Sequence, residues 1–102
     1  MYRVYFIYPK DSKRFDENGL RPWVDWVLAR LGSDCLGGGC GHADFVDTQP
    51  VFGTNFRALA YFDFSDRLFA FDTFNKNDFV AILDKMLDFT DKPPIIQGVF
   101  VD

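Results

Sequence analysis

Hydrophobic positions along the chain follow two spacings, one typical of strands and one typical of helices. Residues 2–8 carry aromatic or β-branched side chains at odd and even positions alike, which predicts a strand that is covered on both faces or lies centrally in a sheet. Between residues 20 and 31, hydrophobic side chains recur at helical spacing, with Pro22 in the first turn and Gly32 at the stop. The stripe of this predicted helix consists of Leu20, Trp23, Val24, Val27, Leu28 and Leu31.

The second half of the chain predicts a hairpin, a helix and a closing strand. Residues 57–65 and 67–74 alternate in character, and a turn at residues 65–66 would pair them as a hairpin. Residues 75–89 form the second predicted helix, and residues 95–101 form the last strand. The buried stripe of that helix is predicted to consist of Phe79, Ile82, Leu83, Met86 and Leu87.

The segment between the first helix and the hairpin is harder to assign. Residues 33–41 are rich in glycine and are predicted to form a loop. Residues 43–52 can hold a short strand, which Pro50 restricts to a sheet edge or to the strand's ends. A connection of this length without structure would be unusual in a compact domain, so we expect an extra edge strand in the 33–56 region.

Together these elements predict one α+β domain over residues 1–102, a ferredoxin-like sandwich of order βαββαβ. Two helices would pack on one face of an antiparallel-rich sheet. The other face would be exposed unless a partner covers it, and it would carry Leu59, Tyr61 and Leu68. A homodimer formed through that open face is one candidate assembly.

The charge balance limits the choice of partner. The chain carries 15 acidic residues against 11 lysines and arginines, a net charge of −4. A protein that grips a phosphate backbone normally presents a basic stripe, whereas the densest basic group here, Lys10, Lys13 and Arg14, is flanked by acids. We therefore expect no direct nucleic-acid binding. An acidic surface suits a basic protein partner, and the 13 phenylalanines can supply interface anchors as well as core.

The N-terminal segment bears on location. Its first ten residues are apolar only over a short stretch before they become charged. This stretch is too short for a signal-peptide core or a membrane span, so we expect a cytoplasmic protein without membrane association. In that compartment, Cys35 and Cys40 are expected to be thiols rather than a disulfide.

A candidate metal site lies in and after the glycine-rich segment, where thiolate, imidazole and carboxylate ligands follow one another. Its residues are Cys35, Cys40, His42 and Asp44. The spacing lacks the paired knuckles of structural zinc sites, so a loop with two ordinary thiols is the competing interpretation. A Cys-His catalytic pair in the same segment would need a third group to orient the base. We assign no cofactor and no catalytic residue.

A candidate recognition surface lies on the predicted hairpin, where carboxylates ring aromatic side chains. Tyr61, Asp63 and Asp72 fall on one predicted face, with Asp66 at the turn. A hairpin with an apolar inside and a solvated acidic outside is the plainer interpretation of the same pattern. Trp26 lies off the stripe of the first helix, and is either a further anchor or a side chain wrapped onto the sheet's flank.

These features favour a small acidic protein-binding domain that inhibits or regulates a basic, nucleic-acid-handling protein by covering its surface. Bacterial immunity proteins and phage-encoded inhibitors share this size and charge, which is a resemblance of class. Two alternatives stay open. One is a small homodimeric ferredoxin-like enzyme that acts on a small molecule around the segment from Cys35 to Asp44, and the other is a structural zinc-binding domain. An enzyme is less favoured than a binding protein.

Overall fold

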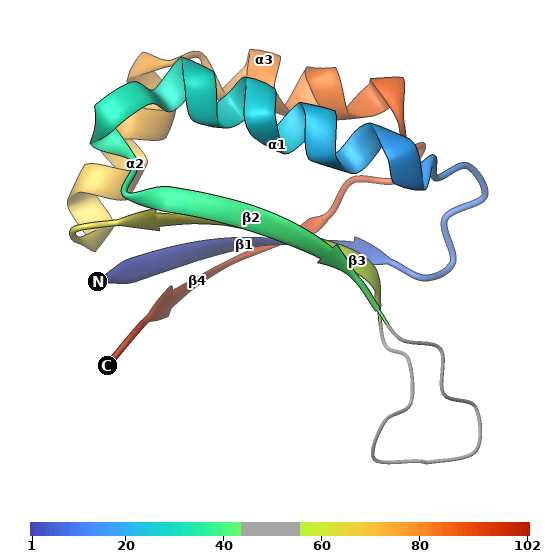
Figure 1. The fold of residues 1–102 in the computed structure, drawn as a ribbon, viewed down its shortest axis with the longest axis horizontal. Helices are drawn as coiled ribbons and strands as arrows, with labels where there is room; N and C mark the ends of the chain where they lie inside the picture. The colour runs from blue at the N-terminus through green and yellow to red at the C-terminus, as the bar shows by residue number, and fades with distance from the viewer. Residues whose placement is uncertain (44–55) are drawn as a thin grey trace.

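The computed structural model describes residues 1–43 and 56–102, in which four antiparallel strands form one sheet in the spatial order β2-β3-β1-β4. The helices lie together on one face of this sheet (Figure 1). The predicted fold class, a ferredoxin-like α+β sandwich, is therefore confirmed. In chain order the elements are β1 (Tyr2–Pro9), α1 (Glu17–Leu31), η1 (Gly32–Asp34), β2 (Gly37–His42), β3 (Phe56–Phe64), α2 (Arg67–Lys76), α3 (Phe79–Lys85), η3 (Met86–Asp88) and β4 (Ile95–Phe100).

The first helix lies where its hydrophobic spacing predicts it. The Asp16 carboxylate caps α1 by accepting a hydrogen bond from the backbone N–H of Asn18 at 3.0 Å. Gly32 ends the helix with a φ of 65°, in the left-handed region that glycine adopts without strain. The buried side chains are those of the predicted stripe apart from the partly buried Leu28, namely Leu20, Trp23, Val24, Val27 and Leu31.

The predicted hairpin is wrong in its second strand, because residues 67–74 belong to α2. Asp66 begins this helix, and its side chain accepts a hydrogen bond from the backbone N–H of Phe69 at 2.8 Å. The buried residues Ala70, Thr73 and Phe74 are three and four positions apart, as one face of a helix requires. The turn at residues 65–66 therefore joins a strand to a helix.

A break at Asp78 divides the second predicted helix. Asp78 has a φ of 59°, and its side chain accepts a hydrogen bond from the backbone N–H of Ala81 at 3.2 Å, which starts α3. The predicted helix over residues 75–89 therefore corresponds to the end of α2, α3 and η3. Its predicted stripe faces inward at Ile82 and Met86, which are buried.

The glycine-rich segment predicted as a loop contains β2, which pairs with β3 at one edge of the sheet. An edge strand in the 33–56 region is thus present, but it is the second of the four strands rather than an addition to them. Glycine fits at Gly38 because a Cβ atom there would lie 2.5 Å from the carbonyl oxygen of Tyr61 and 3.2 Å from Cδ2 of Leu28. The alternative strand position lies, beyond Ala43, outside the described residues.

Aromatic side chains fill the space between the sheet and the helices. Phe6 on β1 meets Trp23 and Phe62 edge to face, with ring centroids 5.4 and 5.7 Å apart. The indole N–H of Trp23 donates to the carbonyl oxygen of Ile82 at 3.1 Å, which ties α1 to α3. The Tyr8 hydroxyl donates to the sulfur of Met86 at 3.0 Å, and burial raises the pKa of that hydroxyl. One continuous aromatic core therefore holds α1, α3 and η3 to the sheet.

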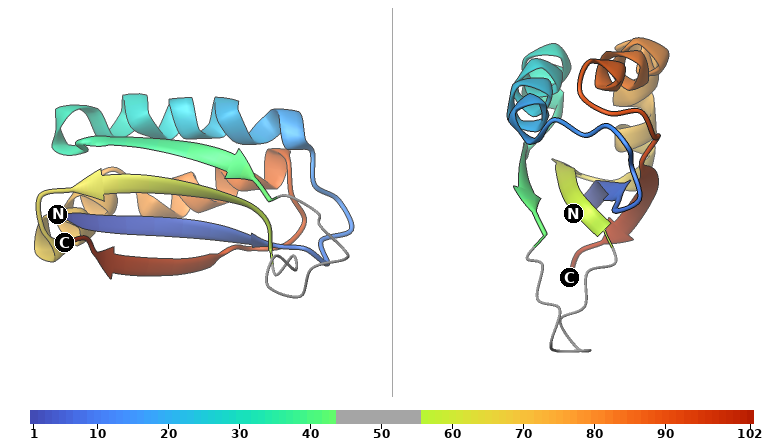
Figure 2. Two further views of the ribbon diagram at one scale, coloured as in Figure 1. Left: turned by 60° about the horizontal axis from the view of Figure 1, so that its bottom comes forward. Right: turned by 90° about the vertical axis from the view of Figure 1, so that its right-hand side faces the viewer.

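The helices divide into two groups above the sheet. Figure 2 shows α1 over the β2 side and the α2–α3 group over the β1 and β4 side. The two chain termini lie at the same end of the sheet, where the backbone N–H of Val101 donates to the carbonyl oxygen of Met1 at 2.9 Å. The opposite face of the sheet carries no helix among the described elements.

Candidate functional site

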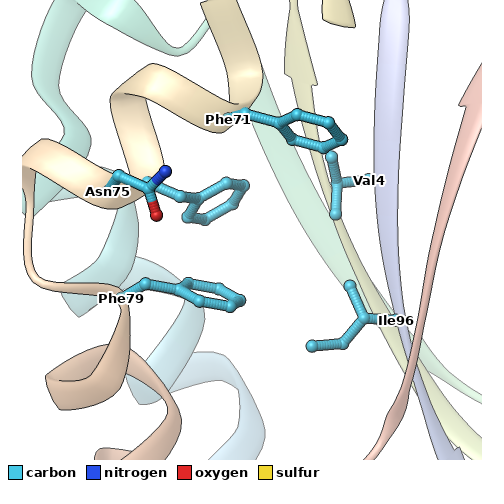
Figure 3. Close-up of a pocket in the computed structure, with 6 residues that line it drawn as sticks. Val4, Phe71, Asn75, Phe79 and Ile96 are labelled. Atoms are coloured by element: carbon cyan, nitrogen blue, oxygen red, sulfur yellow. The ribbon is translucent and has the colours of Figure 1, made fainter. Parts of the chain in front are cut away.

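A pocket with aromatic walls opens between the α2–α3 group and the strands β1 and β4. Its cavity has a volume of about 190 Å³. In Figure 3 the rings of Phe71 and Phe79 point from the helices toward Val4 and Ile96 on the strands. The lining residues are Val4, Phe71, Phe74, Asn75, Phe79 and Ile96.

The local sequence explains how these side chains meet. Phe71, Phe74 and Asn75 lie three and four residues apart, so α2 presents them on one face. The break after α2 then turns the chain and places the ring of Phe79 5.3 Å from the ring of Phe74. On the sheet side, Ile96 is in register with the buried Phe6, so its side chain faces the helices. The pocket is thus built from four separate elements.

The chemistry of the pocket suits binding more than proton transfer. Three benzyl groups and two aliphatic side chains make an apolar wall. Asn75 is the polar side chain among the lining residues, and its amide can both donate and accept a hydrogen bond. Among the described residues that line this cavity there is no acid, base, thiol or hydroxyl group. The pocket can therefore orient a ligand through one amide while it buries the ligand's apolar surface.

A second cavity lies beside the first, and the two share Ile96 as a wall. Its volume is about 250 Å³. The apolar part of its lining comes from Leu83, Met86, Leu87, Pro93, Pro94 and Ile96. The two cavities therefore follow one another along the same edge of the sheet, between β4 and the helices.

The open face of the sheet carries an ion pair set among tyrosines. Arg3 Nε donates to Asp63 Oδ1 at 2.7 Å, and Arg3 Nη2 donates to Asp63 Oδ2 at 3.0 Å. The guanidinium also lies 4.2 Å from the centre of the Tyr61 ring. Hydrogen bonds to Asp63 and Tyr5 raise the pKa of Arg3. The carboxylate of Asp63 is therefore already neutralised within the chain.

The residues predicted to form a recognition surface lie in different places. Tyr61 and Asp63 are neighbours of Arg3 on the open sheet face. Asp66 caps α2, and Asp72 is exposed on that helix. Trp26 is half-buried on α1, with the guanidinium of Arg30 5.1 Å from its ring centre. The structure thus brings together Tyr61 and Asp63, whereas the other three residues lie away from them on helices. Leu68, predicted on the open face, is on α2 as well.

The residues predicted as metal ligands are spread along the glycine-rich segment. Cys35 precedes β2, and its thiol donates to the carbonyl oxygen of Gly37 at 3.3 Å. Burial raises the pKa of the Cys35 thiol. Cys40 and His42 follow on β2, while Asp44 lies outside the described residues. Within residues 1–43 and 56–102, no group of three potential ligands is close enough to hold a metal ion.

The hydrophobic spacing along the chain did not predict the aromatic pocket. Its helical half was hidden because residues 67–74 were expected to be a strand, which would place Phe71 and Phe74 on opposite faces of the sheet. The signal that could have found it is the spacing of Phe71, Phe74 and Asn75 after the helix cap at Asp66. With that helix in place, Phe79 follows the break as a fourth wall residue.

Solved structures share this fold. An EthD-like protein from Ralstonia eutropha JMP134 is 22% identical over 96% of this chain and 88% of its own, with a TM-score of 0.79. An ethyl tert-butyl ether D (EthD) family protein from Bacillus halodurans C-125 is 10% identical over 100% of this chain and 99% of its own, with a TM-score of 0.66. A dimeric protein of unknown function with a ferredoxin-like fold, from Bacteroides fragilis NCTC 9343, is 12% identical over 96% and 92% of the two chains, with a TM-score of 0.61.

These similarities establish the fold. No family model matches the sequence, and no curated protein matches it either. Among the helices that the structure describes, none combines the length and the apolar character needed to cross a membrane.

Proposed function

We propose that this protein is a small-molecule-binding protein that works as a homodimer. Its ligand is a largely apolar molecule with one hydroxyl, ether or carbonyl oxygen. The observation that carries the proposal is the pocket with three phenylalanine walls and one amide, Asn75. Buried apolar surface supplies most of the affinity in such a pocket, and the single polar group sets the orientation.

The chemistry of the ligand agrees with the name carried by structural neighbours. The EthD-like protein and the EthD family protein share the fold of this chain. Ethyl tert-butyl ether, which appears in that family name, is a small apolar molecule with one oxygen acceptor. An ether oxygen can accept a hydrogen bond from the amide of Asn75 while its alkyl groups contact the phenylalanines.

The open sheet face supports the homodimer. It presents Ile7, Leu59, Ile95 and Val99, with the pair of Arg3 and Asp63 beside Val99. Burying such a face removes apolar area from water, and because Arg3 pairs with Asp63, neither of these two charges would be buried without a partner. A neighbour with the same fold is dimeric, and a second copy of this chain would bring an equally apolar face.

Two substitutions on one strand test the pocket and the dimer separately. Ile96 faces the helices and lines the pocket, whereas Ile95 is 63% exposed on the open face of the sheet. Ile96→Trp fills the pocket, so we expect calorimetric binding of phenol to weaken at least tenfold while the dimer persists in light scattering. Ile95→Trp is the matched control, which disturbs the dimer and leaves phenol binding intact.

The outcomes discriminate clearly. The pocket proposal would be contradicted if wild-type protein did not bind phenol at millimolar concentration. It would also be contradicted if wild-type protein and Ile96→Trp bound phenol with the same affinity. A wild-type chain that is monomeric at micromolar concentration would contradict the homodimer. Nuclear magnetic resonance spectra with dispersed amide signals serve as the folding control for both variants.

The earlier hypothesis of an acidic inhibitor stays a prediction. One observation bears on it: Tyr61 and Asp63 lie on the open face, where a partner could cover them. Because Arg3 already pairs with Asp63, that face offers a basic partner little unpaired charge. A basic protein that binds in a salt-dependent way and competes with the dimer would favour the inhibitor over our proposal. The zinc domain and the enzyme around Cys35 to Asp44 also stay predictions.

A further inference from the structure

We infer that the ligand is elongated: its head occupies the aromatic pocket and an alkyl chain continues past Ile96 into the second cavity. This inference rests on the proposed function and adds the class of ligand, an alkyl-substituted phenol or a comparable molecule with a flat head and an apolar tail. The observation behind it is that one side chain, Ile96, lines both cavities.

The sizes of the cavities favour a ligand that spans them. Sites for small molecules usually enclose about 300–1,000 Å³. The aromatic pocket has about 190 Å³ and the second cavity about 250 Å³. Each cavity alone is below that range, whereas the two together lie within it. A ligand confined to either cavity would leave the other open to water against an apolar wall.

The linings of the two cavities differ in a way that matches a head and a tail. Flat phenylalanine rings surround the first cavity, and Asn75 supplies its hydrogen-bonding group. The second cavity is walled mainly by apolar side chains, among them Leu83, Leu87, Pro93 and Pro94, and its polar members are Asp84, Thr90 and Lys92. Aromatic rings favour a flat partner that they can contact edge to face, whereas a wall of aliphatic groups accepts any chain that displaces water.

Ile96 lines both cavities, so a ligand that spans them must pass its side chain. Ile96 lies on the edge strand β4 and is 42% exposed, so its side chain can change rotamer without disturbing the core. Leu87 lines only the second cavity and is exposed on η3. Substitutions at Leu87 can therefore alter the second cavity without changing the lining of the aromatic pocket.

The test is a calorimetric titration with phenol and its 4-ethyl, 4-butyl and 4-hexyl derivatives. Each buried methylene group tightens binding about fourfold, the factor equivalent to about 0.8 kcal/mol. We expect this gain to continue through 4-hexylphenol for wild-type protein. Leu87→Trp fills the second cavity, and should bind phenol like the wild type but lose the gain beyond 4-ethylphenol. Leu68→Trp, on an exposed position of α2 that lines neither cavity, is the matched control.

Each result has a definite meaning. If wild-type protein binds phenol but gains nothing from the longer chains, the inference is overturned and the proposed function stands. If Leu87→Trp keeps the full gain, the chain lies elsewhere and the inference is overturned as well. If neither phenol nor any alkylphenol binds, the proposed function fails together with it. Loss of the gain in Leu87→Trp but not in Leu68→Trp supports the inference.

Discussion

The two edges of the sheet are covered by helices in opposite ways. At the β2 edge, Gly38 lets α1 pack close, since a Cβ atom there would already lie 3.2 Å from Leu28. At the β4 edge, Gly98 is covered by the hydroxyl end of Tyr2, and the helices stand off behind the rings of Phe71 and Phe79. At the β2 edge, the absence of a side chain at Gly38 lets α1 pack directly on the sheet. At the β4 edge, the rings of Phe71 and Phe79 keep the helices away from the strands. The sizes of side chains along the sheet therefore decide where this fold can hold a ligand.

Removing the ring of Phe74 is expected to have the largest effect. Phe74 is buried at the β4 side and contacts the rings of Phe6, Phe62 and Phe64. Phe74→Ala should lower the free energy of unfolding by about 3–5 kcal/mol, because the cavity it leaves adds to the lost apolar contact. Urea denaturation at one fixed protein concentration measures this change.

The control for that substitution lies in the same pocket. Phe71 is 44% exposed, so Phe71→Ala should cost less than about 1.5 kcal/mol, roughly half the value of a fully buried side chain. If Phe71→Ala and Phe74→Ala lowered the free energy of unfolding equally, the different burial of the two rings would not determine their contributions to stability.

A methyl group at Gly38 should break the close approach at the β2 edge. Gly38→Ala places Cβ 2.5 Å from the carbonyl oxygen of Tyr61, a backbone atom that cannot move aside easily. We expect a loss of about 1–3 kcal/mol in the free energy of unfolding. Gly41→Ala, on the same strand with no atom within 4 Å of the new Cβ, should change it by less than about 1 kcal/mol. Tolerance of both substitutions would mean that α1 does not depend on glycine at β2.

Asp66 caps α2, the helix that forms one wall of the aromatic pocket. Asp66→Ala removes the cap of α2 and should lower the free energy of unfolding by about 1 kcal/mol. Asp72→Ala, an exposed change on the same helix, should stay within about 0.5 kcal/mol. Thermal unfolding of the two variants tests whether Asp66 has a structural role. If Asp66 served recognition alone, neither substitution would change the unfolding temperature.

The smallest expected effect is a pH dependence at Tyr8. Burial raises the pKa of its hydroxyl, so the native state keeps a proton that the unfolded chain releases above about pH 10. Stability from this group is therefore full below that pH and declines as the pH rises further. The difference in denaturation midpoint between wild type and Tyr8→Phe should shrink between about pH 9 and 11. A difference that stays constant would exclude this linkage.

The parts of the fold that the sequence predicted are those in which local spacing and burial agree. In α1, the stripe from Leu20 to Leu31 lies directly against the core, so helical spacing appears in the sequence. The sequence of β1 predicts a central strand, and in the structure β3 and β4 pair with it on either side. In these elements the tertiary contacts repeat a pattern that each segment already has alone.

The errors occurred where tertiary contacts override local preference. Glycine is unfavourable in strands, yet β2 contains it because α1 and β3 need the space at Gly38. In α2, the exposed Phe69 and Phe71 are two residues apart, as in a strand, while the buried Ala70, Thr73 and Phe74 follow helical spacing. The aromatic pocket depends on this helix and on Ile96 of a distant strand, so spacing along one segment could not predict it.

Trp23 gives the protein an optical reporter of its own. Its indole is enclosed by Phe6, Tyr8 and Phe62 and donates to Ile82, so its fluorescence should be shifted to short wavelength in the native state. Trp26, the other tryptophan, is half-buried on α1 and would contribute a redder band. Trp26→Phe should leave a single emitter that registers the contact of α1 with α3, and so allow folding to be followed without any added label.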